Sequence, residues 1–222
     1  MEERLRPLLP GARAVAPLAV AVFLFAVTFG ILARSAGMGW LAPLVFSVTT
    51  FAGSAQVAAA SVLDTAGGAS AAVVAAVLLN LRYLPIGLSI APALRGPMVR
   101  RVLEAQLAVD EAWAIAHVGN GRHDRDRLVG AGVIVFVAWV TGTGVGVVGG
   151  GVLGDPAALG LDVLSPALFL ALLIGQVREA RAAGAAVLGA SIALACIPWA
   201  PAGVPIVAAS LVALLGLTGG RR

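Results

Sequence analysis

Charged residues are scarce in this 222-residue sequence, and lysine is absent altogether. Asp, Glu and Arg make up only 12% of the chain, against about 25% charged residues in a typical soluble domain. Hydrophobic residues account for 60%, and there are 28 glycines in addition. This composition excludes a soluble globular protein and a disordered chain. Long apolar runs between short charged stretches are typical of a helical membrane protein.

The sequence also lacks the residue sets that enzymes and metal sites need. Cys196 is the single cysteine, so it cannot form an internal disulfide or anchor a structural zinc site. There is no Ser-His-Asp grouping and no HExxH motif, and no lysine follows the glycine-rich stretch at 139–151 to make a phosphate-binding loop. We therefore expect no enzymatic activity, no metal and no cofactor. The arginines indicate membrane topology rather than a nucleic-acid partner.

Apolar runs long enough to cross a bilayer begin near the N-terminus. Residues 14–33 supply about 20 apolar positions, which is longer than the core of a signal peptide, so we predict an uncleaved first span. Further runs lie at residues 41–63, 69–94, 99–118, 129–148, 164–176, 182–199 and 204–217. The prediction is an all-α, polytopic membrane protein. It forms a single transmembrane domain over 1–222, with a bundle at 14–218 and cytoplasmic termini at 1–13 and 219–222.

Arginine positions suggest which of these runs cross the membrane. If every run crossed, the arginines at 95–101 and at 122–127 would lie on opposite sides, against the positive-inside tendency. If 41–63 and 99–118 each enter and leave on the same side, every arginine cluster becomes cytoplasmic and Arg34 is the only exception. This arrangement predicts six full spans plus one or two broken or re-entrant segments, with both termini in the cytoplasm. Seven or eight complete spans remain the alternative.

Polar residues interrupt the second run near its middle, at residues 49–56. Gly53, Ser54 and Gln56 lie where lipid offers no hydrogen bonds, and non-helical backbone at that depth is tolerated only inside protein or beside a wet cavity. The pattern favours a broken helix whose exposed end binds a substrate carboxylate. Close packing by small residues is the alternative, although it explains Gln56 less well.

The third run carries Asn80, Arg82 and Tyr83 among apolar residues, and Pro85 follows and favours a kink. Arg82 lies too far from the run's end to reach water easily, so it indicates a functional site with an acidic partner. A purely structural ion pair is the alternative.

The fourth run offers the acidic partner, since it contains Asp110 and Glu111. Neighbouring residues on a helix point about 100° apart, so one acid is expected to pair with Arg82 and the other to take and release a proton. The alternative is an amphipathic helix at the membrane surface with its acids in water. In the glycine-rich stretch, Gly142 and Gly146 predict tight helix packing, and Thr141 is a further candidate for a cavity.

Taken together, residues 51–56, the Asn80-Leu81-Arg82-Tyr83 block and the Asp110-Glu111 pair resemble the AzlC family. The resemblance runs from about residue 10 to 215 and includes the block at 166–169. It implies a bacterial inner-membrane permease that exports branched-chain or related amino acids together with a small AzlD-type membrane subunit. Tyr83 fits a family position that is aromatic or histidine.

From the residues and the resemblance together we expect a proton-coupled secondary transporter in the bacterial cell membrane. Gly53, Ser54, Gln56, Asn80 and Arg82 would form its central site. Weak echoes between residues 28–56 and 141–176 are compatible with an internal repeat, and a homo-oligomer is also possible. The alternative from another class is a non-transporting assembly or regulatory subunit whose buried polar groups only hold helices together.

Overall fold

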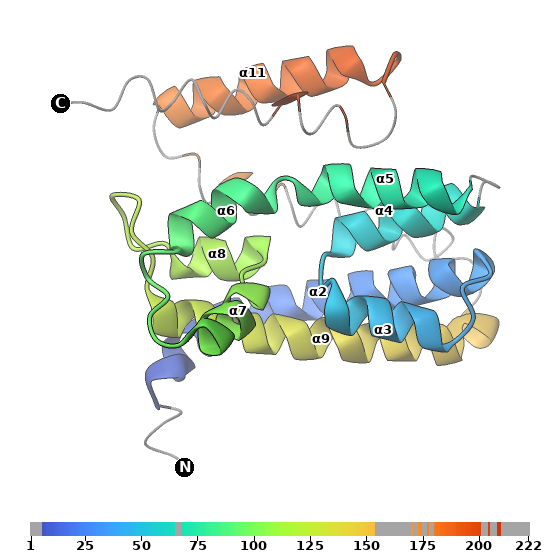
Figure 1. Cartoon of the computed structure of the whole chain (residues 1–222), viewed down its shortest axis with the longest axis horizontal. Helices are drawn as coiled ribbons and strands as arrows, with labels where there is room; N and C mark the ends of the chain where they lie inside the picture. The colour runs from blue at the N-terminus through green and yellow to red at the C-terminus, as the bar shows by residue number, and fades with distance from the viewer. Residues whose placement is uncertain are drawn as a thin grey trace.

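The computed structural model describes residues 6–64, 68–153 and 180–200, together with residues 170, 173–174, 177, 204 and 208–209. Its named elements are all helices: η1 (Arg6–Leu8), α2 (Leu9–Ser35), α3 (Leu41–Thr49), α4 (Gly53–Asp64), α5 (Ala69–Asn80), α6 (Tyr83–Ile90), α7 (Met98–Gln106), α8 (Asp110–Ala116), α9 (Arg125–Leu153) and α11 (Ala180–Cys196) (Figure 1). The predicted all-α class is therefore confirmed for the described part of the chain.

Three helices in the described residues are long and apolar enough to cross a membrane: Arg6–Ser35, Ala69–Ile90 and Arg125–Gly150. The second of these comprises α5 and α6, which are separated by a turn at Leu81 and Arg82. Ala182–Cys196 is apolar but shorter. The predicted runs at 164–176 and 204–217, the block at 166–169 and both chain ends lie wholly or almost wholly outside the described residues, so the count of six spans and the internal repeat stay predictions.

The two runs expected to be irregular are each divided into two short helices. Figure 1 shows α3 running into the bundle from the end where α2 finishes, and α4 returning to that same end. α7 and α8 make the corresponding hairpin from the opposite end, where α6 finishes and α9 begins. The tips of the hairpins touch, because the Gln106 side-chain amide donates to the Thr49 carbonyl at 2.8 Å. Two half-length hairpins thus meet inside the bundle.

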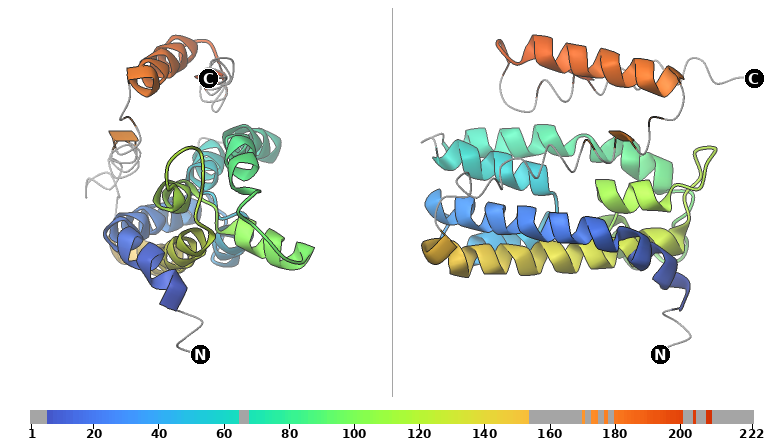
Figure 2. Two further views of the ribbon diagram at one scale, coloured as in Figure 1. Left: turned by 90° about the vertical axis from the view of Figure 1, so that its left-hand side faces the viewer. Right: turned by 180° about the vertical axis from the view of Figure 1, so that it is seen from behind.

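The arginine clusters of the described residues all belong to one end of this arrangement. The start of α2, the segment after α6, helix α7 and the starts of α9 and α11 carry them, and these parts lie toward the same end in both figures (Figures 1 and 2). Arg34 lies near the other end of α2, as does Asp64 at the end of α4. The two hairpins are what bring the arginines together, as the charge pattern had suggested.

Helices α2 and α9 pack against each other along their length, because glycines remove the side chains between them (Figure 1). A Cβ atom at Gly146 would meet the Val27 carbonyl, and one at Gly142 would meet the Phe23 carbonyl. Gly30 of α2 is equally close to the α9 backbone at Thr143. The predicted small-residue packing of Gly142 and Gly146 is confirmed.

An ion cluster joins α7 to the beginning of α9 at the arginine-bearing end. The Glu104 carboxylate accepts hydrogen bonds from Arg125 Nε at 2.8 Å and Arg100 Nε at 2.7 Å, and Arg125 Nη2 also contacts it. Arg125 Nη1 lies 2.6 Å from Asp126 Oδ1. The hydrogen bonds from Arg125, reinforced by Arg100, hold the pKa of Glu104 below its ordinary value although burial acts in the opposite direction. The cluster fixes one leg of the α7–α8 hairpin to the long helix α9.

A polar cavity between two broken helices

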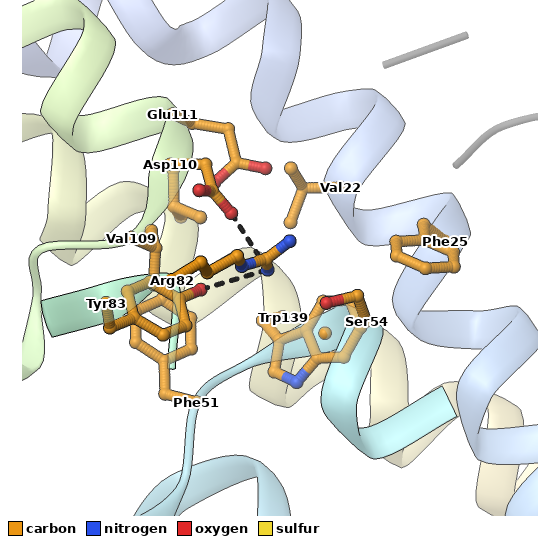
Figure 3. Close-up of a pocket in the computed structure, with 12 residues that line it drawn as sticks. Val22, Phe25, Phe51, Ser54, Arg82, Tyr83, Val109, Asp110, Glu111 and Trp139 are labelled. Atoms are coloured by element: carbon orange, nitrogen blue, oxygen red, sulfur yellow. Dashed lines mark hydrogen bonds and ion pairs between the residues drawn. The ribbon is translucent and has the colours of Figure 1, made fainter. Parts of the chain in front are cut away.

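A small cavity of about 30 Å³ lies where the two hairpin tips meet the middle of α2, α9 and the α5–α6 turn (Figure 3). This volume holds roughly two water molecules. Its apolar wall includes Val22 and Phe25 of α2 and Val135 and Trp139 of α9. Its polar residues are Ser54, Arg82, Tyr83, Asp110 and Glu111. Charged groups from two separate segments, together with the Ser54 hydroxyl from a third, therefore line one cavity.

An ion pair crosses this cavity between the α5–α6 turn and the start of α8. Arg82 Nη2 lies 2.9 Å from Asp110 Oδ2, and the two side chains are only 17% and 21% exposed. Arg82 also donates to the Tyr83 hydroxyl at 3.3 Å, and its guanidinium carbon lies 5.1 Å from the centre of the Tyr83 ring. Figure 3 shows the Glu111 carboxylate beside that of Asp110. Of the two neighbouring acids, Asp110 is the one paired with Arg82.

Glu111 is more deeply buried than Asp110, with only 8% of the residue exposed. Both acids lie in the first turn of α8, where the unpaired backbone amides and the helix dipole favour negative charge. The alternative of a surface helix with these acids in water is therefore wrong. Helix α7 exposes Val99 and Leu103, but its own acid, Glu104, is only 6% exposed and belongs to the ion cluster with Arg100 and Arg125.

The beginning of α4 forms the opposite side of the cavity. The chain reverses at Phe51, whose φ of 44° is in the left-handed region, and α4 then starts at Gly53. A Cβ atom at Gly53 would lie 2.7 Å from the Trp139 ring, so only glycine allows this approach. Ser54 Oγ is buried without a hydrogen-bond partner in the described part of the chain. A helix N-terminus and an unsatisfied hydroxyl thus border the cavity, and both suit an anionic group.

A buried hydrogen-bond network holds this helix break in place. Gln56 Oε1 accepts from Trp139 Nε1 at 3.0 Å and from the Ala52 amide at 3.2 Å. Gln56 Nε2 donates to Ser47 Oγ at 3.0 Å, and the Ser47 hydroxyl lies 2.9 Å from that of Thr143. Gln56, Ser47 and Thr143 are fully buried. The network ties α3, α4 and α9 together at the point where the backbone is irregular.

The structure places the predicted site residues in two groups. Gly53, Ser54, Arg82, Tyr83, Asp110 and Glu111 line the cavity. Three others do not. Gln56 supports the helix break from behind, and Asn80 ends α5 outside the lining. Thr141 is exposed and donates to the Val137 carbonyl of its own helix at 2.6 Å, whereas Thr143 is the threonine that faces inward.

This arrangement can be compared with known proteins. The family model described as AzlC protein matches residues 17–153, which include every residue that lines the cavity. The chain belongs to the AzlC family. The resemblance noted in the sequence is thereby confirmed, and the match ends where α9 ends.

Two relatives of this AzlC chain extend the similarity beyond that region. An uncharacterized membrane protein of Archaeoglobus fulgidus is 32% identical over 201 residues, covering 88% of this chain and 87% of the relative. The branched-chain amino acid transport protein AzlC of Bacillus subtilis is 26% identical over 180 residues, covering 78% and 69% respectively. No solved structure matches the chain. Family and relatives support a membrane location and a transport role.

Two features of the AzlC site were missed by sequence reasoning. Trp139 both lines the cavity and donates to Gln56, yet in sequence it only begins the glycine-rich stretch. A buried indole N–H needs an acceptor, and an intramembrane amide needs a donor, so the pairing was a possible inference. Phe51 belongs to the recognised polar block, but its left-handed backbone has no signal in a phenylalanine.

Proposed function

We propose that this protein is a secondary transporter that exports branched-chain or related amino acids across the bacterial inner membrane. The observation that carries the proposal is the juxtaposition of opposite charges in one buried cavity: Arg82 and the α4 N-terminus face Asp110 and Glu111. An α-amino acid carries the complementary pair, a carboxylate and an ammonium, on one carbon atom. A site with both signs of charge is what a zwitterion needs.

The Arg82–Asp110 ion pair provides a way to bind such a zwitterion without burying new net charge. In the closed cavity each of these groups satisfies the other at 2.9 Å. An amino acid that inserts between them presents its carboxylate to Arg82 and the Ser54 hydroxyl, and its ammonium to Asp110. One ion pair is exchanged for two, so the desolvation penalty of the buried charges stays compensated.

Glu111 suggests how transport is coupled to protons. When both acids are ionised, Arg82, Asp110 and Glu111 together carry one excess negative charge in a buried place, which is costly. A single proton on Glu111 removes that excess. A bound zwitterion adds no net charge, but its ammonium lies beside the two acids while its carboxylate lies at Arg82 and Ser54, so it favours the ionised form of Glu111. We therefore propose that Glu111 takes up a proton when the substrate leaves on the outside and releases it when the next substrate binds on the inside. Export is then coupled to proton entry.

The closed cavity must open for this cycle, because about 30 Å³ cannot hold an amino acid. The two hairpin tips are the proposed moving parts, since transporters commonly place discontinuous helices at the substrate site. The remaining parts of the proposal come from the family, and the orientation of the termini comes from the arginine pattern. A small AzlD-type membrane subunit is the expected partner, both termini are placed in the cytoplasm, and the protein would be the large subunit of a two-component exporter.

The direct test is efflux from cells loaded with dipeptides of valine, leucine, isoleucine or methionine. Cells would express the chain alone, with an AzlD-type subunit, or with that subunit and an Asp110→Asn chain. We expect efflux only with both subunits and its loss in the variant. If both proteins reach the membrane and no amino acid leaves faster, the branched-chain assignment is wrong. If the wild-type pair shows no amino acid efflux and substitutions reduce only the yield of the complex, the chain is an assembly subunit.

A further inference from the structure

A second, larger space adjoins the polar cavity. Its volume is about 280 Å³, close to the lower end of the range of roughly 300 to 1,000 Å³ found for small-molecule sites. Thr50 and Gln106 at the hairpin tips contribute polar groups, and the described residues that line this space include no charged side chain. The polar cavity contains charges but little room, whereas this neighbour contains room but no charge.

Helix α6 and the α7–α8 hairpin form the walls of the second space. Ile86, Gly87 and Ile90 line it from α6, and Ala105 and Ala108 line it from the hairpin. A Cβ atom at Gly87 would meet nothing within 4 Å, so the glycine leaves open volume at this wall. Small and branched aliphatic residues around an open volume suit an aliphatic ligand group of a few carbons.

Three residues separate the two spaces, since Phe51, Tyr83 and Val109 line both. In Figure 3 they gather on one side of the Arg82 guanidinium, with Ser54 on the other side. Phe51 is held by edge-on contact with Phe136 at 5.0 Å between ring centres, and its backbone is in the left-handed region. The partition therefore rests on one side chain at each of three helix breaks, α3–α4, α5–α6 and α7–α8, rather than on continuous helix.

The second space lies on the side of the arginine-bearing end. It follows α6 from Tyr83 to Ile90, and α6 finishes at the end where the arginines collect (Figure 1). By the positive-inside tendency this end faces the cytoplasm, where an exported amino acid must enter.

We propose that the second space is the binding pocket for the aliphatic side chain of the exported amino acid. The pocket is reached from the cytoplasmic side. It joins the polar cavity when Phe51, Tyr83 and Val109 shift. The proposal rests on the proposed function and adds a basis for selecting one kind of amino acid side chain. The charged groups recognise the amino and carboxyl groups common to all amino acids, and this pocket selects the branched aliphatic chain.

The test fills the pocket and compares substrates that differ by one methylene. Gly87→Leu and Ala105→Phe occupy the pocket from opposite walls. Gly184→Leu on α11, which has open space around it, and Leu103→Phe on the exposed face of α7 are the matched controls. We expect the ratio of leucine to valine efflux to fall about tenfold or more in the filled variants, since one methylene in an apolar pocket is worth about 10- to 200-fold. The controls should keep the wild-type ratio.

A second measurement covers the case in which the filled variants fail to fold. Cys196 is the single cysteine, so Gly87→Cys in a Cys196→Ala background gives one reactive thiol in the pocket. Leucine is expected to slow its labelling by N-ethylmaleimide more than glycine does. An unchanged efflux ratio in the filled variants would overturn the pocket while leaving the proposed exporter intact. The same conclusion would follow if leucine did not affect the labelling of a chain that exports leucine. Absence of leucine efflux from the wild-type pair would overturn the proposed function and this pocket with it.

Discussion

Removing one partner of the Arg82–Asp110 ion pair should destabilise the protein, and removing both partners together should cost less than the sum of the two single removals. Removing one partner of a fully buried pair costs about 3 to 5 kcal/mol, because the other charge remains buried without compensation. Arg82 and Asp110 are 17% and 21% exposed, so solvent reduces this cost. We expect Arg82→Met to destabilise the protein by about 2 to 3 kcal/mol, and Asp110→Asn by less, because Glu111 remains as an anion close to Arg82.

The measurement is a double-mutant cycle on the protein in detergent, followed by thermal melting. For a chain of this size about 2 to 4 °C corresponds to each kcal/mol, so Arg82→Met should lower Tm by roughly 5 to 10 °C and Asp110→Asn by less. The Arg82→Met/Asp110→Asn double variant should lose clearly less than the sum of the two. Arg100→Met is the matched control, because Arg100 is 53% exposed and a surface ion pair contributes only about 0 to 1 kcal/mol. Additive losses, within about 0.5 kcal/mol, would refute the coupling.

Three further predictions concern the scaffold around the site. Gln56→Leu removes the acceptor of two buried donors, Trp139 Nε1 among them, and should cost about 2 to 4 kcal/mol; an unchanged melting curve would contradict the bracing role. Gly146→Leu forces α2 and α9 apart and should abolish the monodisperse peak in gel filtration, whereas Gly184→Leu, with open space around it, should keep that peak. The lowered pKa of Glu104 means that its stabilising contribution is complete above the unfolded value of about 4.3 and is lost as pH falls through the folded value. Between pH 6 and pH 3, Tm of the wild type should therefore drop more than that of Glu104→Gln, and parallel curves would argue against the ion cluster.

The helix breaks could be predicted from sequence because each depends on local chemistry. Residues 49–56 contain hydroxyls, a glycine and an amide within an apolar run, and the structure interrupts the helix there between Thr49 and Gly53. Pro85 lacks the N–H that would bond to the Leu81 carbonyl, and the turn between α5 and α6 includes Leu81. In both cases the residues that disturb the helix lie within one or two turns of the disturbance.

The partners of the polar residues could not be predicted in the same way. Gln56 and Trp139 are 83 residues apart, and their hydrogen bond exists only because α4 and α9 are brought together. Thr141 and Thr143 are two residues apart on α9, so they point to nearly opposite sides. Which of them faces inward depends on the rotation of a helix without a polar face, and no pattern in the sequence fixes that rotation.

The central claim is that the site recognises both charges of an amino acid, and exchange of labelled leucine in vesicles tests it most directly. The vesicles would contain the purified chain with an AzlD-type subunit. Competitors would be unlabelled leucine, 4-methylpentanoate, which lacks the ammonium, and 3-methylbutylamine, which lacks the carboxylate. We expect leucine to compete fully and both analogues to compete at least about 100-fold more weakly, since each leaves a buried charge without its partner. Competition by either analogue as strong as that by leucine would contradict the assignment of Arg82 and Asp110 to the two ends of the substrate.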